Sequence, residues 1–544
     1  MSRALMLLMS VFFLASCTDP GPQNVNVVPS DASAVATFDF YSIAKKGKLD
    51  EFKEFKTYPK ISEFLNEESE VLGDLFSQMI DDPSISGIDW SKKAIWFMEG
   101  IESPSAYMVL EMDDKAKFRA MLDKVKEEAA ADAEDIKSGE GFDYIDGGGS
   151  IMAWNDNVVL MKMDGAYDSE AALSDVAERL ANTQENSIAA SEKFNTFYNE
   201  GNDVAFWMPV AQFYDIYSNA MNNMSSEAMP RMDWLFEGES FVIAALNFNK
   251  DDYRMTMRLD PSDEVRAKLD EIYTGEPLDA DILNYLPADA YMLITAHSAK
   301  DAKSTVMELY GEDAFTGMDE VMANAGVPFK YSEILESFGG NFAMSISSIA
   351  MEPYMREQYN YYTGETEMVE DMRPNMGMSA VIDLTNRDVL DFAMDTLMVM
   401  SEGMLVQDGQ QYYFEIPDMG TTVRVTYNEE RAFITTIDDA MIAYLNGGYG
   451  DASLGKTDLG KKAASMSFYM YFNADMSTYP GQIQQMMNNP MTAQAKPVLD
   501  MLKSIELHPT GDYEGSYIIN FHETEDNALY DLLSLMDDMG ARFL

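Results

Sequence analysis

Several residue types are scarce in this sequence of 544 residues, and each scarcity excludes a class of structure or chemistry. Cys17 is the single cysteine, so no disulfide can stabilise the fold. The three histidines lie too far apart in the sequence to indicate a zinc site, and we predict no metal and no cofactor. Lysine and arginine number 38 against 93 aspartates and glutamates, which gives a formal net charge of −55. Such a surface repels phosphate groups, so we expect no nucleic acid partner.

Long apolar runs are scarce as well. The run ALMLLMSVFFL near the start is shorter than the roughly 20 residues that a membrane-spanning helix needs. It is typical of a secretory signal peptide, which we assign to residues 1–16. Residues 14–16 (Leu-Ala-Ser) before Cys17 resemble the bacterial lipobox, in which the cysteine thiol forms a thioether with a diacylglycerol. We therefore predict a lipid on Cys17 as the membrane anchor and a lipidated tether at residues 17–26.

The rest of the sequence contains pairs of similar blocks in the same order. VVPSDASAVATFDF at 27–40 matches YLPADAYMLITAHS at 285–298. Further matching pairs are 107–125 with 379–397, 152–160 with 425–433, and 252–259 with 512–519. Repeated blocks in register indicate duplication. We therefore predict two copies of one domain at residues 27–274 and 282–544, joined by a linker at 275–281.

Periodicity within each copy predicts both strands and helices. In the segment 252–259 apolar residues alternate with polar ones, which is typical of a strand with one covered face. Helices are expected after the capping residues Asp113 and Thr385. Their apolar faces repeat with spacing 0, 3, 4, 7 in both copies, at Phe118, Met121, Leu122 and Val125, and at Leu390, Ala393, Met394 and Leu397. The predicted class is α+β: two tandem copies of one domain, each a largely antiparallel sheet with helices packed on one side.

The lipobox, the short tether and the opening VPSDASAVATFDF resemble a family of bacterial lipoproteins, familiar from the Bacteroidetes, that is described as a domain of unknown function of the 4836 type. The resemblance covers nearly the whole chain after the signal peptide. It implies a lipid-anchored protein of the cell envelope, which we place at the outer membrane, and it supplies no catalytic residues. Whether the chain faces the periplasm or the cell surface stays open, and so does its oligomeric state.

Motifs for known chemistry are incomplete. SIAK at 42–45 has the Ser-x-x-Lys spacing of penicillin-recognising enzymes, but Ser-Asp-Asn and Lys-Thr-Gly are missing, so a helix start is expected. MRPNMGM at 372–378 spaces thioethers as some Cu(I) sites do, although apolar positions account for most of the 44 methionines. Two function classes remain. We favour a non-catalytic binding or scaffolding protein with an envelope protein as partner. The alternative is an envelope hydrolase that acts on glycan or peptide with paired carboxylates, for which the sequence names no catalytic residue.

The two copies differ most after their second predicted strand. In the first copy eight residues, 99–106, lead to the next strand, whereas 27 residues, 351–377, stand at the corresponding place in the second. This insert predicts a long hairpin or loop beyond the sheet. Tyrosines are favoured at contact surfaces because a rigid ring adds area at a small entropic cost. We therefore predict contact with a partner through the four tyrosines of the insert, Tyr354, Tyr359, Tyr361 and Tyr362.

Overall fold

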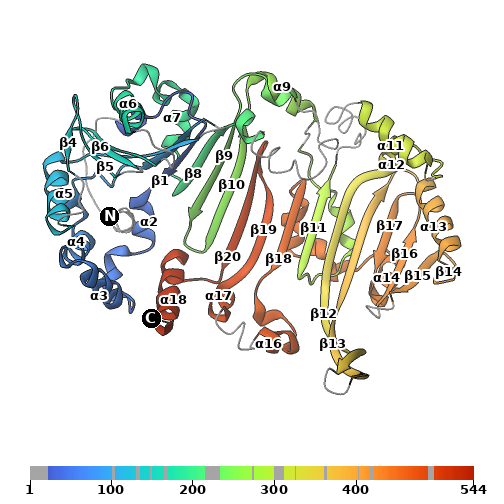
Figure 1. The fold of residues 1–544 in the computed structure, drawn as a ribbon. Helices are drawn as coiled ribbons and strands as arrows, with labels where there is room; N and C mark the ends of the chain where they lie inside the picture. The colour runs from blue at the N-terminus through green and yellow to red at the C-terminus, as the bar shows by residue number, and fades with distance from the viewer. Residues whose placement is uncertain are drawn as a thin grey trace. The chain divides into compact units, whose positions relative to one another are not determined.

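The computed structural model describes residues 22–100, 104–129, 135–147, 150–163, 169–214, 233–272, 275–298, 312–324, 326–360, 364–401, 403–416, 421–487 and 495–543 (Figure 1). These residues form two compact units. Unit 1 lies within Met1–Ala220, Glu239–Asp260 and Glu523–Leu544, and unit 2 lies within Met221–Gly238 and Pro261–His522. Each unit combines helices with an antiparallel sheet, which confirms the α+β class.

The sheet of unit 1 contains ten strands among the described residues. They are β1 (Ala34–Phe38), β2 (Ala94–Glu99), β3 (Ser105–Glu111), β4 (Lys137–Ser138), β5 (Asp143–Asp146), β6 (Ile151–Trp154), β7 (Val158–Lys162), β8 (Val204–Pro209), β9 (Phe241–Phe248) and β10 (Asp252–Asp260). Antiparallel pairing connects them in the order β4-β5-β6-β7-β3-β2-β1-β8-β9-β10. The strand predicted from the alternation at 252–259 is therefore β10.

Helices cover both faces of this sheet. They are α2 (Phe40–Lys46), α3 (Tyr58–Glu68), α4 (Glu70–Asp81), α5 (Lys115–Ala129), α6 (Ser169–Leu180), α7 (Glu192–Asn199) and α18 (Ala528–Phe543). One core joins Leu160 of β7 to α6 and α7, and a second core joins the adjacent Val159 to α4 and α5. The prediction of helices on one side is therefore wrong for unit 1, because consecutive apolar residues along β7 point to opposite faces and each needs cover.

The sheet of unit 2 also contains ten strands among the described residues. They are β11 (Met292–His297), β12 (Phe338–Asn360), β13 (Glu365–Leu384), β14 (Leu405–Asp408), β15 (Gln411–Ile416), β16 (Thr421–Tyr427), β17 (Arg431–Thr435), β18 (Phe468–Asn473), β19 (Leu502–Gly511) and β20 (Glu514–Phe521). Antiparallel pairing connects them in the order β14-β15-β16-β17-β13-β12-β11-β18-β19-β20.

Unit 2 likewise has apolar cores on both faces of its sheet. Its helices are α9 (Asp263–Ile272), α11 (Glu312–Asn324), α12 (Tyr331–Glu336), α13 (Asp388–Met400), α14 (Asp438–Leu445), α15 (Asp458–Ala464), α16 (Gly481–Met487) and α17 (Lys496–Met501). Val381 of β13 packs in a core with residues of α14 and α15, whereas the adjacent Ile382 packs with residues of α13. One-sided helix packing is therefore also wrong here, for the same reason.

The helices predicted after Asp113 and Thr385 are present as α5 and α13, but they begin later than expected. Asp114, not Asp113, accepts hydrogen bonds from the backbone at the start of α5. At α13 Asn386 accepts from the backbone N–H of Asp388, while the Thr385 hydroxyl donates to a carbonyl group. The apolar faces predicted for these two helices agree in part with the burial of their side chains. Phe118, Met121, Leu122 and Met394 are buried, whereas Leu397 is exposed.

The C-terminal helix α18 is part of unit 1. Its Asp537 is buried and accepts hydrogen bonds from the backbone N–H of Lys56 and Thr57, both at 2.7 Å, and from the Thr57 hydroxyl at 2.5 Å. Tyr253 of β10 donates to the carbonyl of Ala528. In unit 2, Tyr513 of the β19–β20 turn donates to Asp270 of α9. In unit 1 the hairpin of β9 and β10 thus contacts α18, which follows β20 in the chain. In unit 2 the hairpin of β19 and β20 contacts α9, which follows β10.

Candidate functional site

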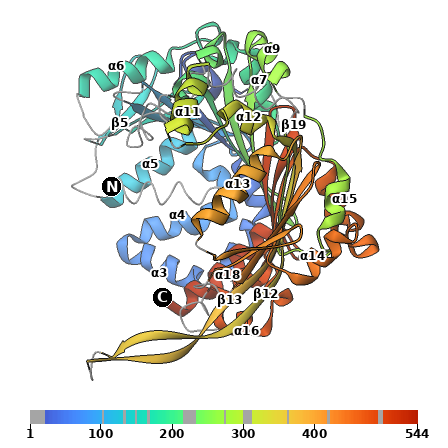
Figure 2. The ribbon, with the colours of Figure 1, turned by 90° about the vertical axis from the view of Figure 1, so that its right-hand side faces the viewer.

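The longest strands of unit 2, β12 and β13, extend far beyond the rest of their sheet. Their pairing runs without interruption from Ser348↔Gly377 to Asn360↔Glu365. The neighbour β11 pairs with β12 no further than Ile346, and β17 pairs with β13 only from Ser379. Residues 348–360 and 365–377 therefore form a two-stranded ribbon, which Figure 2 shows projecting from the sheet of unit 2. The predicted hairpin is present.

The two faces of this ribbon differ in chemistry. Residues paired directly across the strands share a face, and successive pairs alternate between the faces. One face, called the methionine face, consists of Ile349, Met351, Pro353, Met355, Glu357, Tyr359, Thr366, Met368, Glu370, Met372, Pro374 and Met376. The opposite face, called the polar face, consists of Ser348, Ala350, Glu352, Tyr354, Arg356, Gln358, Glu367, Val369, Asp371, Arg373, Asn375 and Gly377.

The methionine face is exposed along its length. Four of its methionines and its tyrosine have between 41 and 57% of their surface accessible, namely Met355, Tyr359, Met368, Met372 and Met376. The five methionines alternate between the strands along the ribbon, in the order 376, 351, 372, 355, 368. Methionine side chains are flexible and polarizable, so an exposed row of them suits a surface that binds another molecule.

The side chains of the polar face contact one another. Arg356 pairs with Asp371 at 2.5 Å, and Asn375 donates to Glu352 at 2.8 Å. Arg373 lies over the ring of Tyr354, 5.3 Å from its centre. The backbone N–H of Met372 and the guanidinium of Arg356 hold the pKa of Asp371 below its ordinary value. These contacts stabilise the ribbon and leave its other face available.

The four tyrosines predicted to contact a partner do not share one face. Tyr359 lies on the methionine face and is 53% exposed, whereas Tyr354 lies on the polar face beneath Arg373. Tyr361 and Tyr362 lie outside the described residues, and so does Cys17. Contact through Tyr354, Tyr359, Tyr361 and Tyr362, and lipidation at Cys17, therefore stay predictions.

The methionine face continues onto the sheet of unit 2. Along β13, Met376, Met378 and Ala380 share one face, because the alternation of this strand is unbroken. Across the sheet the same face includes Met344 and Ile346 of β12, Met292 and Ile294 of β11, and Met470 of β18. The surface is therefore a single apolar face that runs from β18 to the ribbon.

A β-bulge decides which residues of β12 belong to this face. The pairing with β13 shifts by one residue between Ile346 and Ser348. Before the bulge the even-numbered residues Met344 and Ile346 lie on the face, and beyond it the odd-numbered residues do, beginning with Ile349. One extra residue reverses the alternation, so Met351 and Met355 join the methionines of β13.

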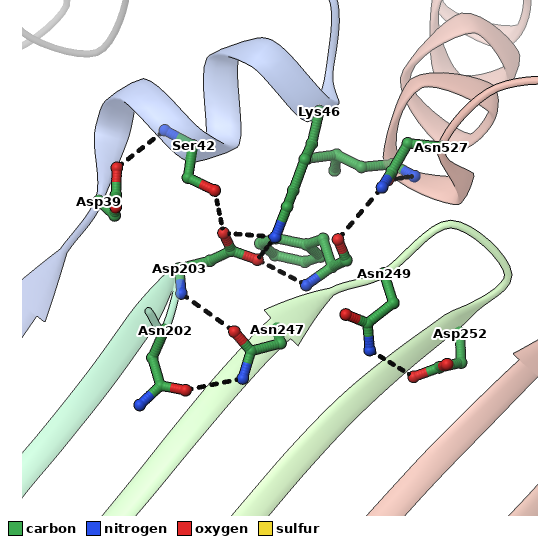
Figure 3. A network of polar contacts seen from close by, with 11 residues as sticks. Asp39, Ser42, Lys46, Asn202, Asp203, Asn247, Asn249, Asp252 and Asn527 are labelled. Atoms are coloured by element: carbon green, nitrogen blue, oxygen red, sulfur yellow. Dashed lines mark hydrogen bonds and ion pairs between the residues drawn. The ribbon is translucent and has the colours of Figure 1, made fainter. Parts of the chain in front are cut away.

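In unit 1 the most elaborate polar cluster surrounds Asp203, which is fully buried before β8 (Figure 3). Its carboxylate accepts hydrogen bonds from the Ser42 hydroxyl at 2.6 Å, from Lys46 at 2.6 and 2.7 Å, and from the backbone N–H of Phe248 at 2.7 Å. Asp39 caps α2 by accepting from the backbone N–H of Ser42, as expected of a helix start. All these donors make Asp203 a structural link between α2 and β9.

The other three buried carboxylates among the described residues also accept hydrogen bonds from groups of the chain itself. Glu111 accepts from the backbone N–H of Gln23 and Asn24, and burial raises its pKa. Glu506 accepts from Tyr469 at 2.9 Å and Asn520 at 3.1 Å, and it pairs with Lys462. Asp537 binds Lys56 and Thr57 as described above. A hydrolase would therefore have to use more exposed carboxylates.

Two features are absent from the described part of the chain. No group of histidine, cysteine, aspartate and glutamate residues there is arranged to hold a metal ion. No helix there is long and apolar enough to cross a membrane.

Residues 24–529 match the family model of a domain of unknown function, DUF4836. The chain belongs to this family. Comparison with curated proteins gives no match to this chain. Two similar solved structures are crystal form III of TP0453, with 12% identity over 49% of this chain and 90% of that chain, and crystal form I of TP0453, with 9% identity over 47% and 88%. Their TM-scores are 0.25 and 0.26, which is too low to support an inference about fold or function.

Proposed function

We propose that this DUF4836 chain is a non-catalytic, lipid-anchored protein of the bacterial cell envelope that binds an envelope protein through the methionine face. The observation that carries the proposal is the ribbon itself. It exposes a row of large apolar side chains on one face, and contacts within the ribbon occupy the other. Soluble proteins rarely expose contiguous apolar patches of this kind unless they bind a partner.

The polar clusters favour binding over catalysis. A general acid or base must reach the reacting group of its substrate. The four buried carboxylates of the described residues, Glu111, Asp203, Glu506 and Asp537, instead bind backbone or side-chain donors of the chain itself. Ser42 donates to Asp203, whose carboxylate also pairs with Lys46, so the serine–lysine contact of a Ser-x-x-Lys enzyme is not formed with Lys45.

We also infer that residues 27–274 and 282–544 are two copies of one domain, and the pairing registers support this. Thr37 and Thr295 pair with Ile95 and Ala343 on one side. On the other side they pair with Ala205 and Tyr469. The backbone N–H of Asp39 donates to the carbonyl of Asp203, and His297 donates in the same way to Ser467. Equal strand order and equal register are expected of a duplicated domain.

The proposed location rests on the lipid at Cys17. A single acyl chain gives only reversible membrane binding, so the diacylglycerol of a lipoprotein provides the two chains needed for stable anchoring. Near this end of the chain, Val25 is buried in the core of unit 1, and the adjacent Asn24 is hydrogen-bonded to Glu111. The anchor therefore connects to unit 1 through a short segment. We place it in the outer membrane.

Two experiments test these proposals. The Cys17→Ser chain should lose its acyl label and leave the membrane fraction, and retention there without a label would contradict the anchor. For the binding role, residues 351–376 should be replaced by a short turn that joins Ala350 to Gly377. Capture of the envelope partner by this trimmed chain should be abolished, and undiminished capture would contradict the role of the ribbon.

A further inference from the structure

We propose that the segment bound by the methionine face is a cationic amphipathic polypeptide, with apolar side chains on the methionines and basic side chains beside them. This inference rests on the proposed function, because it specifies the partner of the same surface. The chemistry of three features leads to it: the charges on the face, the prolines at the ribbon edges, and the dimensions of the methionine row.

The charges of the methionine face are exclusively negative. Glu357 lies opposite Met368, and Glu370 lies opposite Met355. Neither carboxylate forms a hydrogen bond or ion pair within the described residues. The two arginines of the ribbon, Arg356 and Arg373, both lie on the polar face. A bound segment would therefore meet methionines flanked by unpaired carboxylates, which complements apolar residues flanked by lysine or arginine.

The ribbon edges discourage addition of another strand. Strand addition requires a row of outward-facing backbone N–H and C=O groups. Pro353 pairs with Met372, and Pro374 pairs with Met351, so each strand carries one residue that has no N–H. Prolines are tolerated in strands where the N–H would face outward, and they protect exposed edges. The bound segment should therefore lie on the face of the ribbon rather than extend its sheet.

The methionine row is long enough for a specific segment. Thirteen residues of β12 form the ribbon, Ser348–Asn360, which corresponds to roughly 40 Å at about 3.3 Å per residue. Flexible methionines can repack around different apolar side chains, so the face suits a partner that is defined by its amphipathic pattern.

Charge disfavours two other occupants. A second copy of this chain would bring together two molecules that each carry a net charge of −55, and their acidic ribbons would repel each other. A lipid bilayer would have to accept Glu357 and Glu370 together with the methionines, and buried carboxylates are costly in lipid.

The test uses the full Cys17→Ser chain, which carries no lipid. Its affinity should be measured for a synthetic Leu/Lys amphipathic peptide, for a Leu/Glu peptide of the same length and pattern, and for phosphatidylcholine vesicles. Two further variants each replace two glutamates of the ribbon by glutamine, one pair on each face. Glu357→Gln/Glu370→Gln removes two charges from the methionine face, and Glu352→Gln/Glu367→Gln removes two from the polar face as a matched control.

The Leu/Lys peptide should bind, and the Leu/Glu peptide and the vesicles should not. The methionine-face pair should weaken binding of the Leu/Lys peptide by about three- to tenfold, as expected for two solvated charge pairs, while the control pair changes it by less than about twofold. Equal weakening by both pairs, or binding to vesicles instead of peptide, would overturn the inference. If either contradicting result occurs while the trimmed chain still loses its partner, the proposed function stands and only the chemistry assigned to the partner is wrong.

Discussion

The hairpin of β2 and β3 in unit 1 and the ribbon of β12 and β13 in unit 2 occupy the same place in their sheets. At the base the pairs are alike, Ile95↔Val109 in unit 1 and Ala343↔Val381 in unit 2. In unit 1 the pairing ends at Glu99↔Ser105, whereas in unit 2 it continues to Asn360↔Glu365. The difference shows that two strands can be lengthened into an exposed ribbon while the core beneath them keeps its register.

A second difference lies in the pair next to the hairpin. In unit 1, Tyr107 pairs with Lys162, which is buried and forms an ion pair with Asp175. The same register in unit 2 holds Ser379 and Thr435, whose hydroxyl groups are 2.9 Å apart. At this position of the sheet, unit 1 therefore has a lysine paired with an aspartate, and unit 2 has two hydroxyl groups in contact. Stability should accordingly be distributed differently between the units, although the strand order is the same.

The largest stability effect is expected at Asp203 of unit 1. Asp203→Ala would leave Lys46, Ser42 and the Phe248 N–H without their acceptor, and breaking such a buried pair costs about 3 kcal/mol. The corresponding change in unit 2, Ser467→Ala, should cost less than about 1 kcal/mol. Urea unfolding of both variants measures the difference, and equal losses would contradict it.

A smaller effect is expected at α18. Asp537→Ala removes the acceptor of three hydrogen bonds from Lys56 and Thr57, so the free energy of unfolding should fall by about 2 kcal/mol. The adjacent Asp538→Ala is the control, because its ion pair with Lys56 is exposed and should contribute less than about 1 kcal/mol. Thermal unfolding followed by circular dichroism compares the two. A smaller loss at Asp537 would show that α18 is not held by this carboxylate.

Trimming the ribbon should change stability least among these alterations. The chain in which Ala350 is joined to Gly377 keeps every pair between β12 and β11 and between β13 and β17. Its free energy of unfolding should stay within about 0.5 kcal/mol of the intact chain, as for surface changes away from the core. Calorimetry checks this, and a large loss would mean that the ribbon is part of the fold of unit 2.

The pH dependence of the ribbon should be confined to acid conditions. Because the folded ribbon lowers the pKa of Asp371, this group contributes stability above the unfolded value of about 3.9 and loses it as the pH falls through the folded value. Hydrogen exchange of the ribbon amides should therefore be constant from pH 7 to about 5, after correction for the intrinsic rate, and rise at lower pH. Asp371→Asn should remove the step, and a step that persists would have another origin.

The sequence predicts the fold class and part of the site for identifiable reasons. Alternation of apolar residues marks β10, and the helical spacing places Phe118, Met121 and Leu122 in a core. A long hairpin or loop after the second strand of unit 2 follows from the length of the insert. These signals are local, so they need no knowledge of which strands pair.

The membership of the methionine face could not be predicted in this way. Simple alternation along β12 would group Tyr354 with Met344 and Ile346, but the bulge before Ser348 places Tyr354 on the opposite face. A bulge depends on pairing with a distant strand, which single-sequence periodicity does not contain. Along β13 the sequence does predict a shared face, because Met368, Met372 and Met376 lie four positions apart and residues of a strand alternate between its faces. With Pro353, Pro374 and acidic residues in the same segment, the sequence leaves a hairpin and a loop both open.

The most direct test of the methionine face compares two variants of the intact chain. Met355→Ser/Met368→Ser/Met372→Ser removes three of its four exposed thioethers, and Gln358→Ser/Val369→Ser alters the polar face of the same strands. Quantitative capture of the envelope partner should fall at least about tenfold with the first variant, since well-packed apolar contacts dominate binding, and stay within about twofold with the second. Equal capture by both variants, with both folded, would contradict the central claim that this face binds the partner.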